Sequence, residues 1–143
     1  MSLTPSQIDS INSVAATCHA NATIKGFHDN DSQKSIVDNV GVWCANLHGE
    51  VSELWEAARR DLLRFPCDKA AMMPDGEGGV RHMTCAEEEI ADIIIRAFDS
   101  GRALDINIGE AVASKMAYNA TREHKDRKST RLNSSHVALS RMP

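Results

Sequence analysis

The chain has 143 residues, of which 42% are hydrophobic and 4% aromatic. This length suits one domain with a core that needs no disulfides, and the composition, rich in Ala, Ile, Leu and Glu, favours helices. No apolar run approaches the ~20 residues that cross a bilayer and no signal peptide opens the chain, so we expect a cytoplasmic protein without a membrane partner. The cysteines are widely spaced, which is typical of reduced thiols and not of a disulfide frame or zinc site. They are Cys18, Cys44, Cys67 and Cys85.

The last residues differ sharply in composition from the rest. The eleven residues Asp126–His136 match the translation of a DNA-sequencing adapter, so we interpret 126–143 as a non-native disordered tail; a natural disordered tail is the alternative. The domain is then residues 1–125, with 12 basic and 19 acidic side chains and a formal net charge of −7. Such an acidic domain is a poor binder of nucleic-acid polymers. If it handles phosphates, a bound cation is the obvious means of neutralising its carboxylates.

Two helices are expected in the first half of the chain. Thr4-Pro5 is a helix start, and helical spacing of apolar residues continues to about Lys25. Gly26–Gln33 is a loop by composition. A second helix is expected from about Ile36 to Leu63, because its apolar residues alternate in steps of four and three, like the seam of a bundle. This stripe consists of Val40, Cys44, Leu47, Val51, Leu54 and Ala58.

The second half is expected to hold a long connection and two more helices. Residues 64–83 contain two prolines and three glycines, so we expect a connection with a helical turn around 68–72. Capping residues start a third helix at about 85–103 and a fourth at about 108–122. No strand alternation of useful length is present, so the predicted class is all-α. The third helix should be buried through Ile90, Ile93, Ile94, Ala97 and Phe98.

Acidic pairs occupy matching positions on the second and third helices. In Glu50-x-x-Glu53 and Glu89-x-x-Asp92 the two carboxylates lie one turn apart on one side of a helix. Antiparallel packing would bring all four to the edge of the core, where carboxylates without a counter-charge are costly. Oxygen ligands without nearby Cys or His favour Mg²⁺ or Mn²⁺ over zinc. A solvated acidic helix face is the alternative, whereas a ferritin-like di-iron site would require Glu-x-x-His.

The fourth helix carries a polar face of a different kind. Two cations, a phenol and an amide recur at helical spacing there, which suits an anionic ligand that bears a base or a sugar. The alternative is the solvent-exposed face of an ordinary amphipathic helix, whose cations near the C-terminus interact favourably with the helix dipole. The residues are Lys115, Tyr118, Asn119 and Arg122.

Four blocks of the sequence, in order, resemble the MazG-like superfamily of all-α nucleoside triphosphate pyrophosphohydrolases, in its bacterial and phage branch. The blocks are KGFHDN, LHGEVSELWEAARR, CAEEEIADIIIRAFD and KMAYNATREHK, and the signature is ExxE followed on the next helix by ExxD. The resemblance implies that Mg²⁺ is held by Glu50, Glu53, Glu89 and Asp92. It implies phosphate or nucleoside binding by Lys115, Tyr118, Asn119 and Arg122, and a base pocket shaped by Lys25, Phe27, His28 and Asn30. Thirty-five residues separate Glu53 from Glu89, a longer spacing than is usual in the family.

The implied reaction is Mg²⁺-dependent hydrolysis of a nucleoside triphosphate to the monophosphate and pyrophosphate, with Glu53 or Glu56 activating the water. The implied architecture is a four-helix bundle whose helices pack across a homodimer or homotetramer. Two alternatives stay open: a non-catalytic helical interaction module, and hydrolysis of a phosphoribosyl-nucleotide.

Overall fold

The computed structural model describes residues 3–69 and 71–122, so the tail at 126–143 lies outside the described residues. The predicted helical class is confirmed, with one addition: a small antiparallel hairpin lies between the second and third helices. The helices are α1 Pro5–Ile24, α2 Ile36–Arg59, α3 Cys85–Ala103 and α4 Ile108–Thr121, with a 3₁₀ turn at Asp31–Gln33. The hairpin strands are β1 Met72–Pro74 and β2 Val80–His82.

The helices begin where side chains satisfy their first N–H groups. Thr4 and Thr84 each form a capping box, with Gln7 and Glu87 respectively, as expected for α3 from the sequence. The second helix was predicted to reach Leu63 but ends at Arg59. The chain turns there because Asp61 adopts a left-handed conformation, with a φ of 58°.

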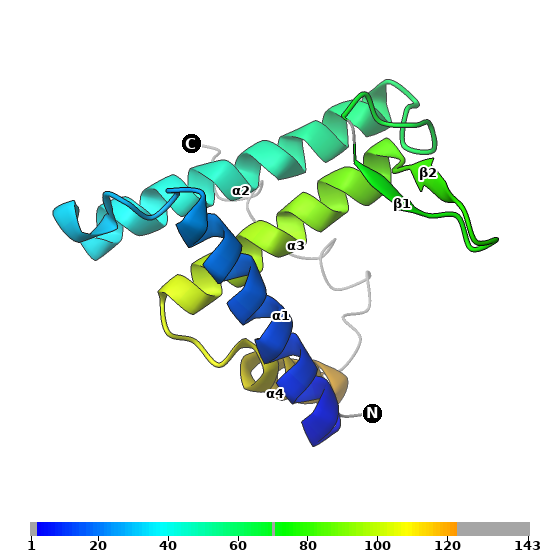
Figure 1. Cartoon of the computed structure of the whole chain (residues 1–143). Coiled ribbons are helices and arrows are strands. Elements are labelled where there is room, and N and C mark those ends of the chain that lie inside the picture. The colour runs from blue at the N-terminus through cyan, green and yellow to red at the C-terminus, as the bar shows by residue number, and fades with distance from the viewer. Residues whose placement is uncertain (1–2, 70, 123–143) are drawn as a thin grey trace, which may run out of the picture.

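Helices α2 and α3 run antiparallel side by side, and α1 packs across α3, as Figure 1 shows. Helix α4 packs mainly on α1. Gly109 permits this contact, because a Cβ atom there would lie 2.5 Å from the carbonyl oxygen of Ile8. The four helices thus pack together, and the antiparallel α2–α3 pair brings the two acidic motifs to one place.

The long connection between α2 and α3 is held by backbone pairing. Residues 68, 69 and 71 are not helical and Met72 begins β1, so the helical turn expected around 68–72 is not found among the described residues. The Cys67 N–H donates to Met83, and the Met83 N–H donates to Ala71. The hairpin then follows, and its turn is closed by the Asp75 carboxylate, which accepts from the N–H groups of Glu77 and Gly79. Met83 therefore pairs with both Cys67 and Ala71, which lie on either side of Lys69.

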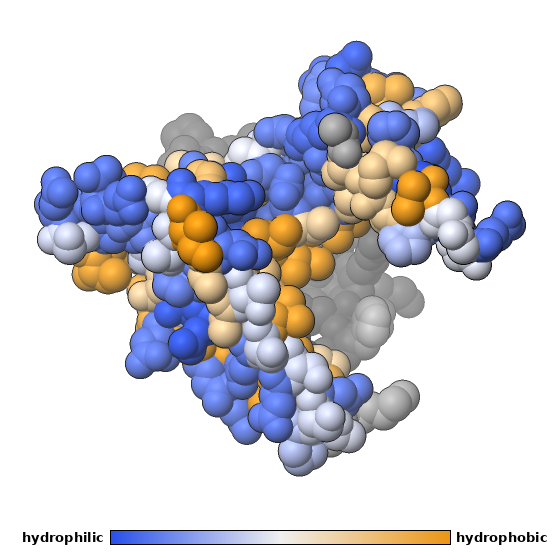
Figure 2. All heavy atoms as spheres, in the orientation of Figure 1, coloured by the Kyte–Doolittle hydropathy of each residue, from blue (hydrophilic) through white to orange (hydrophobic). Residues whose placement is uncertain are grey.

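The predicted apolar stripes are buried only in part, and buried acidic side chains share the inner helix faces with them. Half-buried on these stripes are Val40, Leu47, Leu54, Ala58, Ile93 and Phe98. Among the described residues only Ala15, Trp43 and Cys67 are buried apolar residues, whereas Asn39, Glu50, Glu88, Glu89 and Asp99 are buried polar or charged ones. On the predicted stripes, Val51 is 46% exposed and Ile94 46% exposed. Figure 2 shows apolar side chains at the surface near the middle of the visible face. The acids take the inner face because cationic side chains meet them there. Also exposed are Cys44, Ile90 and Ala97.

Candidate metal and nucleotide site

Three of the four predicted metal ligands converge between α2 and α3. Glu50, Glu89 and Asp92 each offer a carboxylate oxygen, and these oxygens all lie within 4.8 Å of one another. Glu50 and Glu89 are buried, and Asp92 is half-buried. The fourth, Glu53, lies outside this group with its side chain 56% exposed. The predicted convergence of the two motifs is therefore present as geometry, with Glu53 at its open edge.

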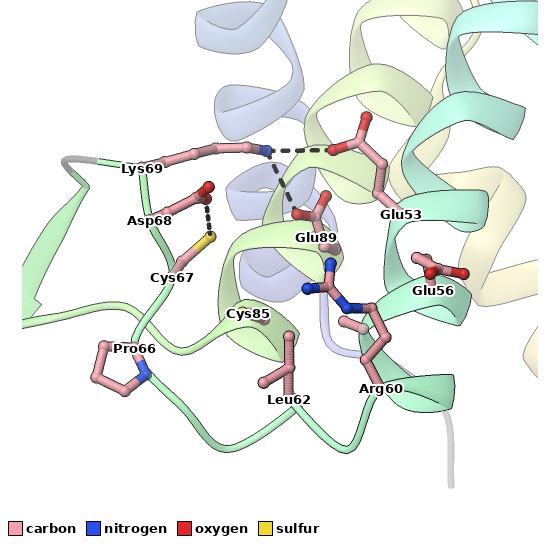
Figure 3. A pocket seen from close by; sticks show the side chains of 11 residues that line it. Glu53, Glu56, Arg60, Leu62, Pro66, Cys67, Asp68, Lys69, Cys85 and Glu89 are labelled. Carbon is pink, nitrogen blue, oxygen red and sulfur yellow. Dashed lines mark hydrogen bonds and ion pairs between the residues drawn. The ribbon is translucent and has the colours of Figure 1, made fainter.

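A lysine from the connection reaches into these carboxylates. The Lys69 ammonium lies 3.3 Å from Glu89 and 3.5 Å from Glu53, and Figure 3 shows it between the two. It also lies 3.7 Å from both Glu88 and Asp92. Burial opposes a charged amine, but the nearby carboxylates, Glu89 foremost, outweigh it and raise the pKa of Lys69 above its ordinary value. The four surrounding carboxylates thus hold one ammonium in common.

The acidic cluster keeps unused acceptor capacity. The Oε2 atoms of Glu88 and Glu89 are buried and have no hydrogen-bond partner among the described residues. Burial raises the pKa of Glu89, Lys69 lowers it, and the charges of Glu53 and Asp92 raise it further. Leaving such oxygens without partners is unfavourable, so they are free ligands for a cation. Ligands of an octahedral Mg²⁺ ion lie about 3.0 Å apart when adjacent and about 4.2 Å apart when opposite, so the three oxygens, which lie within 4.8 Å of one another, would close around an ion.

Arg96 connects the acidic cluster to the α1 side of the molecule. Its Nε donates to Glu50 at 3.2 Å, and its guanidinium lies 5.2 Å from the centre of the Phe27 ring. A pocket of about 260 Å³ opens beside this contact and is lined by Lys25, Phe27, Asp92 and Arg96 among others. Apolar and cationic side chains, and the amide of Asn21, therefore border the acidic cluster on that side.

A larger pocket, of about 410 Å³, opens on the other side of the cluster. Glu53, Lys69 and Glu89 line it together with the end of α2. Glu56 also lines this pocket, but its carboxylate pairs with Arg59 at 3.5 Å. The Cys67 thiol in its wall is not a nucleophile at neutral pH. A backbone N–H at Lys69 lowers the Cys67 pKa, but burial and Glu88 together raise it to about 11.

The residues predicted for a base pocket separate in the structure. Phe27 and His28 line a small cavity of about 40 Å³ beside Trp43, and Phe27 and Lys25 line the 260 Å³ pocket. Asn30 is exposed, precedes the 3₁₀ turn without a side-chain hydrogen bond to it, and lines neither cavity. Phe27 and Lys25 are therefore the pair that the single chain places nearest the acids.

His28 belongs to a hydrogen-bonded network that joins the loop after α1 to α3. Its Nε2 lies 2.8 Å from Asp99, its Nδ1 lies 2.6 Å from Asp31, and His19 adds a second 2.8 Å contact to the same Asp99 oxygen. Burial opposes the imidazolium, but the hydrogen bonds to Asp31 and Asp99 prevail and raise the pKa of His28. The hydrogen bonds of His28 thus tie the loop that carries Phe27 to α3.

The predicted α4 residues lie away from the acids within one chain. Helix α4 packs on α1, and its cations gather around a tyrosine: the Lys115 ammonium is 4.9 Å and the Arg122 guanidinium 6.0 Å from the centre of the Tyr118 ring. Tyr118 and Asn119 are exposed. This face lines neither of the two pockets that border the cluster.

Sequence reasoning missed the cations of the site. Arg96 lies four residues after Asp92, so its position on the acidic face follows from helical spacing alone. Asp99 continues the same face. Lys69 could not be found in this way, because it lies in the irregular connection and is brought to the acids by the bonds to Met83.

Comparison of the chain with models of known protein families, with curated proteins and with solved structures finds no match. Nowhere in residues 3–69 and 71–122 does a helix combine the length and the apolar character that crossing a membrane requires.

Proposed function

We propose that the chain is a divalent-cation-dependent nucleoside triphosphate pyrophosphohydrolase. The observation that carries this proposal is the meeting of Glu50, Glu89 and Asp92 within 4.8 Å, beside two buried carboxylate oxygens without partners. A purely solvated acidic helix face would point outward, and here Glu89 is only 5% exposed. The resemblance of four ordered sequence blocks to the MazG-like enzymes supports the substrate class.

The ligands of the proposed cation, Mg²⁺ or Mn²⁺, are Glu50, Glu89 and Asp92, with Glu53 at the open edge. When bound, the cation would supply charge stabilisation to the phosphate oxygens and the pyrophosphate leaving group. Glu53 is the better candidate for accepting the proton of the attacking water, because its exposed carboxylate borders the 410 Å³ pocket, whereas Glu56 pairs with Arg59. Water adds to the α-phosphorus, the bond to the bridging oxygen breaks, and nucleoside monophosphate and pyrophosphate leave.

The nucleoside end of the substrate has a candidate position on the other side of the cluster. The 260 Å³ pocket offers the Phe27 ring for contact with a base and the Lys25 amine for an acceptor group. Lys115, Tyr118, Asn119 and Arg122 remain proposed ligands of phosphate or nucleoside. Because they lie apart from the acids of their own chain, we assign them to the acids of a second copy.

A second copy of this chain is the proposed occupant of the uncovered apolar faces. The domain has few buried apolar residues, while Ile90, Ile94 and Met73 line an apolar groove of about 390 Å³. An exposed surface of this kind needs a partner to supply the missing core. We therefore infer a homodimer or homotetramer formed through α2 and α3.

Replacing Ile94 with glutamate should break this assembly, because the new carboxylate would be buried in an apolar interface. We expect sedimentation velocity to give a multiple of the 15.6 kDa chain mass for the wild type and the single-chain mass for Ile94→Glu. Ile24→Glu, which changes an 83% exposed residue at the end of α1, is the matched control and should keep the wild-type mass. A wild type that sediments as a single chain would exclude the second copy.

The reaction is tested by measuring pyrophosphate release from a panel of ribo- and deoxyribonucleoside triphosphates, with Mg²⁺ and with a chelator. We expect Mg²⁺-dependent release with at least one nucleotide. In Glu53→Gln this activity should be lost while the circular dichroism spectrum is retained, because the exposed side chain contributes little to folding. Wild-type rates in Glu53→Gln would dismiss its role.

A second candidate function, a non-catalytic helical interaction module, is favoured by the exposed apolar faces. It predicts self-association without turnover of any nucleotide, including a phosphoribosyl-nucleotide added to the same panel. Release of pyrophosphate from that last substrate alone would instead identify the phosphoribosyl-type reaction.

A further inference from the structure

The loop that carries Lys69 is fixed at both of its ends. The Cys67 N–H donates to the Met83 carbonyl at 2.8 Å, and the Met83 N–H donates to the Ala71 carbonyl at 3.1 Å. Pro66 also pairs with Thr84, the residue that caps α3. The apex of a loop held in this way is directed at the first turns of α3, where Glu88, Glu89 and Asp92 lie. The backbone bonds on either side of Lys69 therefore hold it near the start of α3.

The Lys69 ammonium interacts with four carboxylates but satisfies none of them fully. Its contacts range from 3.3 to 3.7 Å, longer than the about 2.8 Å of a strong charge-assisted hydrogen bond. Oε2 of both Glu88 and Glu89 remains without a partner among the described residues. One positive charge also leaves most of the surrounding negative charge unbalanced. The ammonium is thus a loosely held counter-ion, and the unpartnered oxygens would bind a cation of higher charge more tightly.

We propose that Lys69 is the resident counter-ion of the proposed metal site, and that a divalent cation binds by displacing its ammonium from the carboxylates. This inference rests on the proposed function, because it takes the α2–α3 acids as the metal ligands. Two of those acids, Glu89 and Asp92, contact Lys69 directly, so the ammonium and a cation on them compete for the same oxygens. The displaced side chain stays in the wall of the 410 Å³ pocket that it already lines.

Two consequences separate this role from that of an ordinary surface lysine. Without metal, the ammonium stabilises the fold by reducing repulsion among the acids. With metal, the same charge opposes binding, since a cation enters against a positive charge less than 4 Å from its ligands. Removing the charge should therefore weaken the metal-free protein and strengthen metal binding. Replacing a lysine that only packs against its neighbours would not lower the stability and raise the metal affinity at the same time.

The experiment is calorimetric titration of the full chain with Mg²⁺ alone, without nucleotide, together with thermal unfolding in a chelator. Lys69→Gln should bind Mg²⁺ at least ten-fold more tightly than the wild type and unfold at a lower temperature in the chelator. Lys69→Arg keeps the charge and should retain the weaker, wild-type affinity. Lys34→Gln removes an exposed lysine at the other end of α2 and is the matched control, with both properties unchanged.

Unchanged or weaker Mg²⁺ binding in Lys69→Gln, in protein with the wild-type circular dichroism spectrum, would overturn the inference. If the wild type still binds Mg²⁺ and releases pyrophosphate in that case, the proposed function stands and only the role of Lys69 fails. If no variant binds Mg²⁺, the proposed function and the inference fall together. Should Lys69→Gln not fold, tighter Mg²⁺ binding by Lys69→Met in the same titration would support the inference, and wild-type affinity would overturn it.

Discussion

The molecule buries carboxylates in two regions, and it neutralises them in different ways. At the Asp99 network, the imidazoles of His19 and His28 both lie 2.8 Å from one Asp99 oxygen. The other ring nitrogen of His28 lies 2.6 Å from Asp31. At the acidic cluster, Lys69 is shared among four carboxylates at 3.3 Å or more, and two buried oxygens have no described partner. Short contacts with matched partners are typical of a structural element, and long contacts with unused oxygens are typical of a ligand site.

The difference predicts that the acidic cluster serves activity at the expense of stability. Replacing Glu89 with glutamine should reduce pyrophosphate release by about 100-fold or more, because a ligand that holds the charge-stabilising cation is lost. The free energy of unfolding in a chelator should stay the same or rise, since one repelling charge is removed from a buried site. Pyrophosphate assays and urea unfolding measure the two quantities.

Glu77→Gln is the matched control, because Glu77 is exposed in the hairpin turn. It should leave both quantities unchanged. A Glu89→Gln protein that is strongly destabilised but fully active would reverse the assignment of the acidic cluster.

The Asp99 network should behave in the opposite way. Asp99→Ala removes two hydrogen bonds, leaving His19 without this partner and His28 with Asp31 alone, so we expect it to lower the free energy of unfolding by about 3 kcal/mol. The activity of the folded fraction should fall much less than in Glu89→Gln. Urea unfolding followed by circular dichroism gives the first quantity, and assays corrected for the folded fraction give the second.

A smaller effect is expected from pH. Because the pKa of His28 is raised above its ordinary value of 6.5, the folded state binds its proton more tightly than the unfolded state does. The stabilisation is fully present below pH 6.5 and is lost as the pH rises through the higher, folded-state pKa. The free energy of unfolding should therefore fall as the pH increases above 6.5, and His28→Gln should lack this part of the decline.

His48→Gln is the control for the pH series, because His48 is exposed on α2. It should keep the wild-type decline. An identical pH dependence in His28→Gln would show that the titration of His28 does not contribute to the decline.

The fold could be predicted from the sequence where local signals decide it. Caps such as Thr4 and Thr84 set three of the helix starts within a residue, and the spacing of Glu89 and Asp92 placed them on one face. The buried face was predicted only in part, because apolar spacing on Val51 and Ile94 cannot reveal whether the partner surface lies in the same chain. The hairpin and the position of Lys69 were not predicted, because they depend on backbone hydrogen bonds between Cys67, Met83 and Ala71, which no local sequence pattern encodes.

The central claim is that a divalent cation binds where α2 and α3 bring their carboxylates together. The most direct test is anomalous diffraction from crystals of the full chain grown with Mn²⁺. We expect an anomalous peak in contact with Glu89 and Asp92, with the Lys69 ammonium moved away from them. Mn²⁺ bound elsewhere only, with Lys69 still between Glu53 and Glu89, would contradict it.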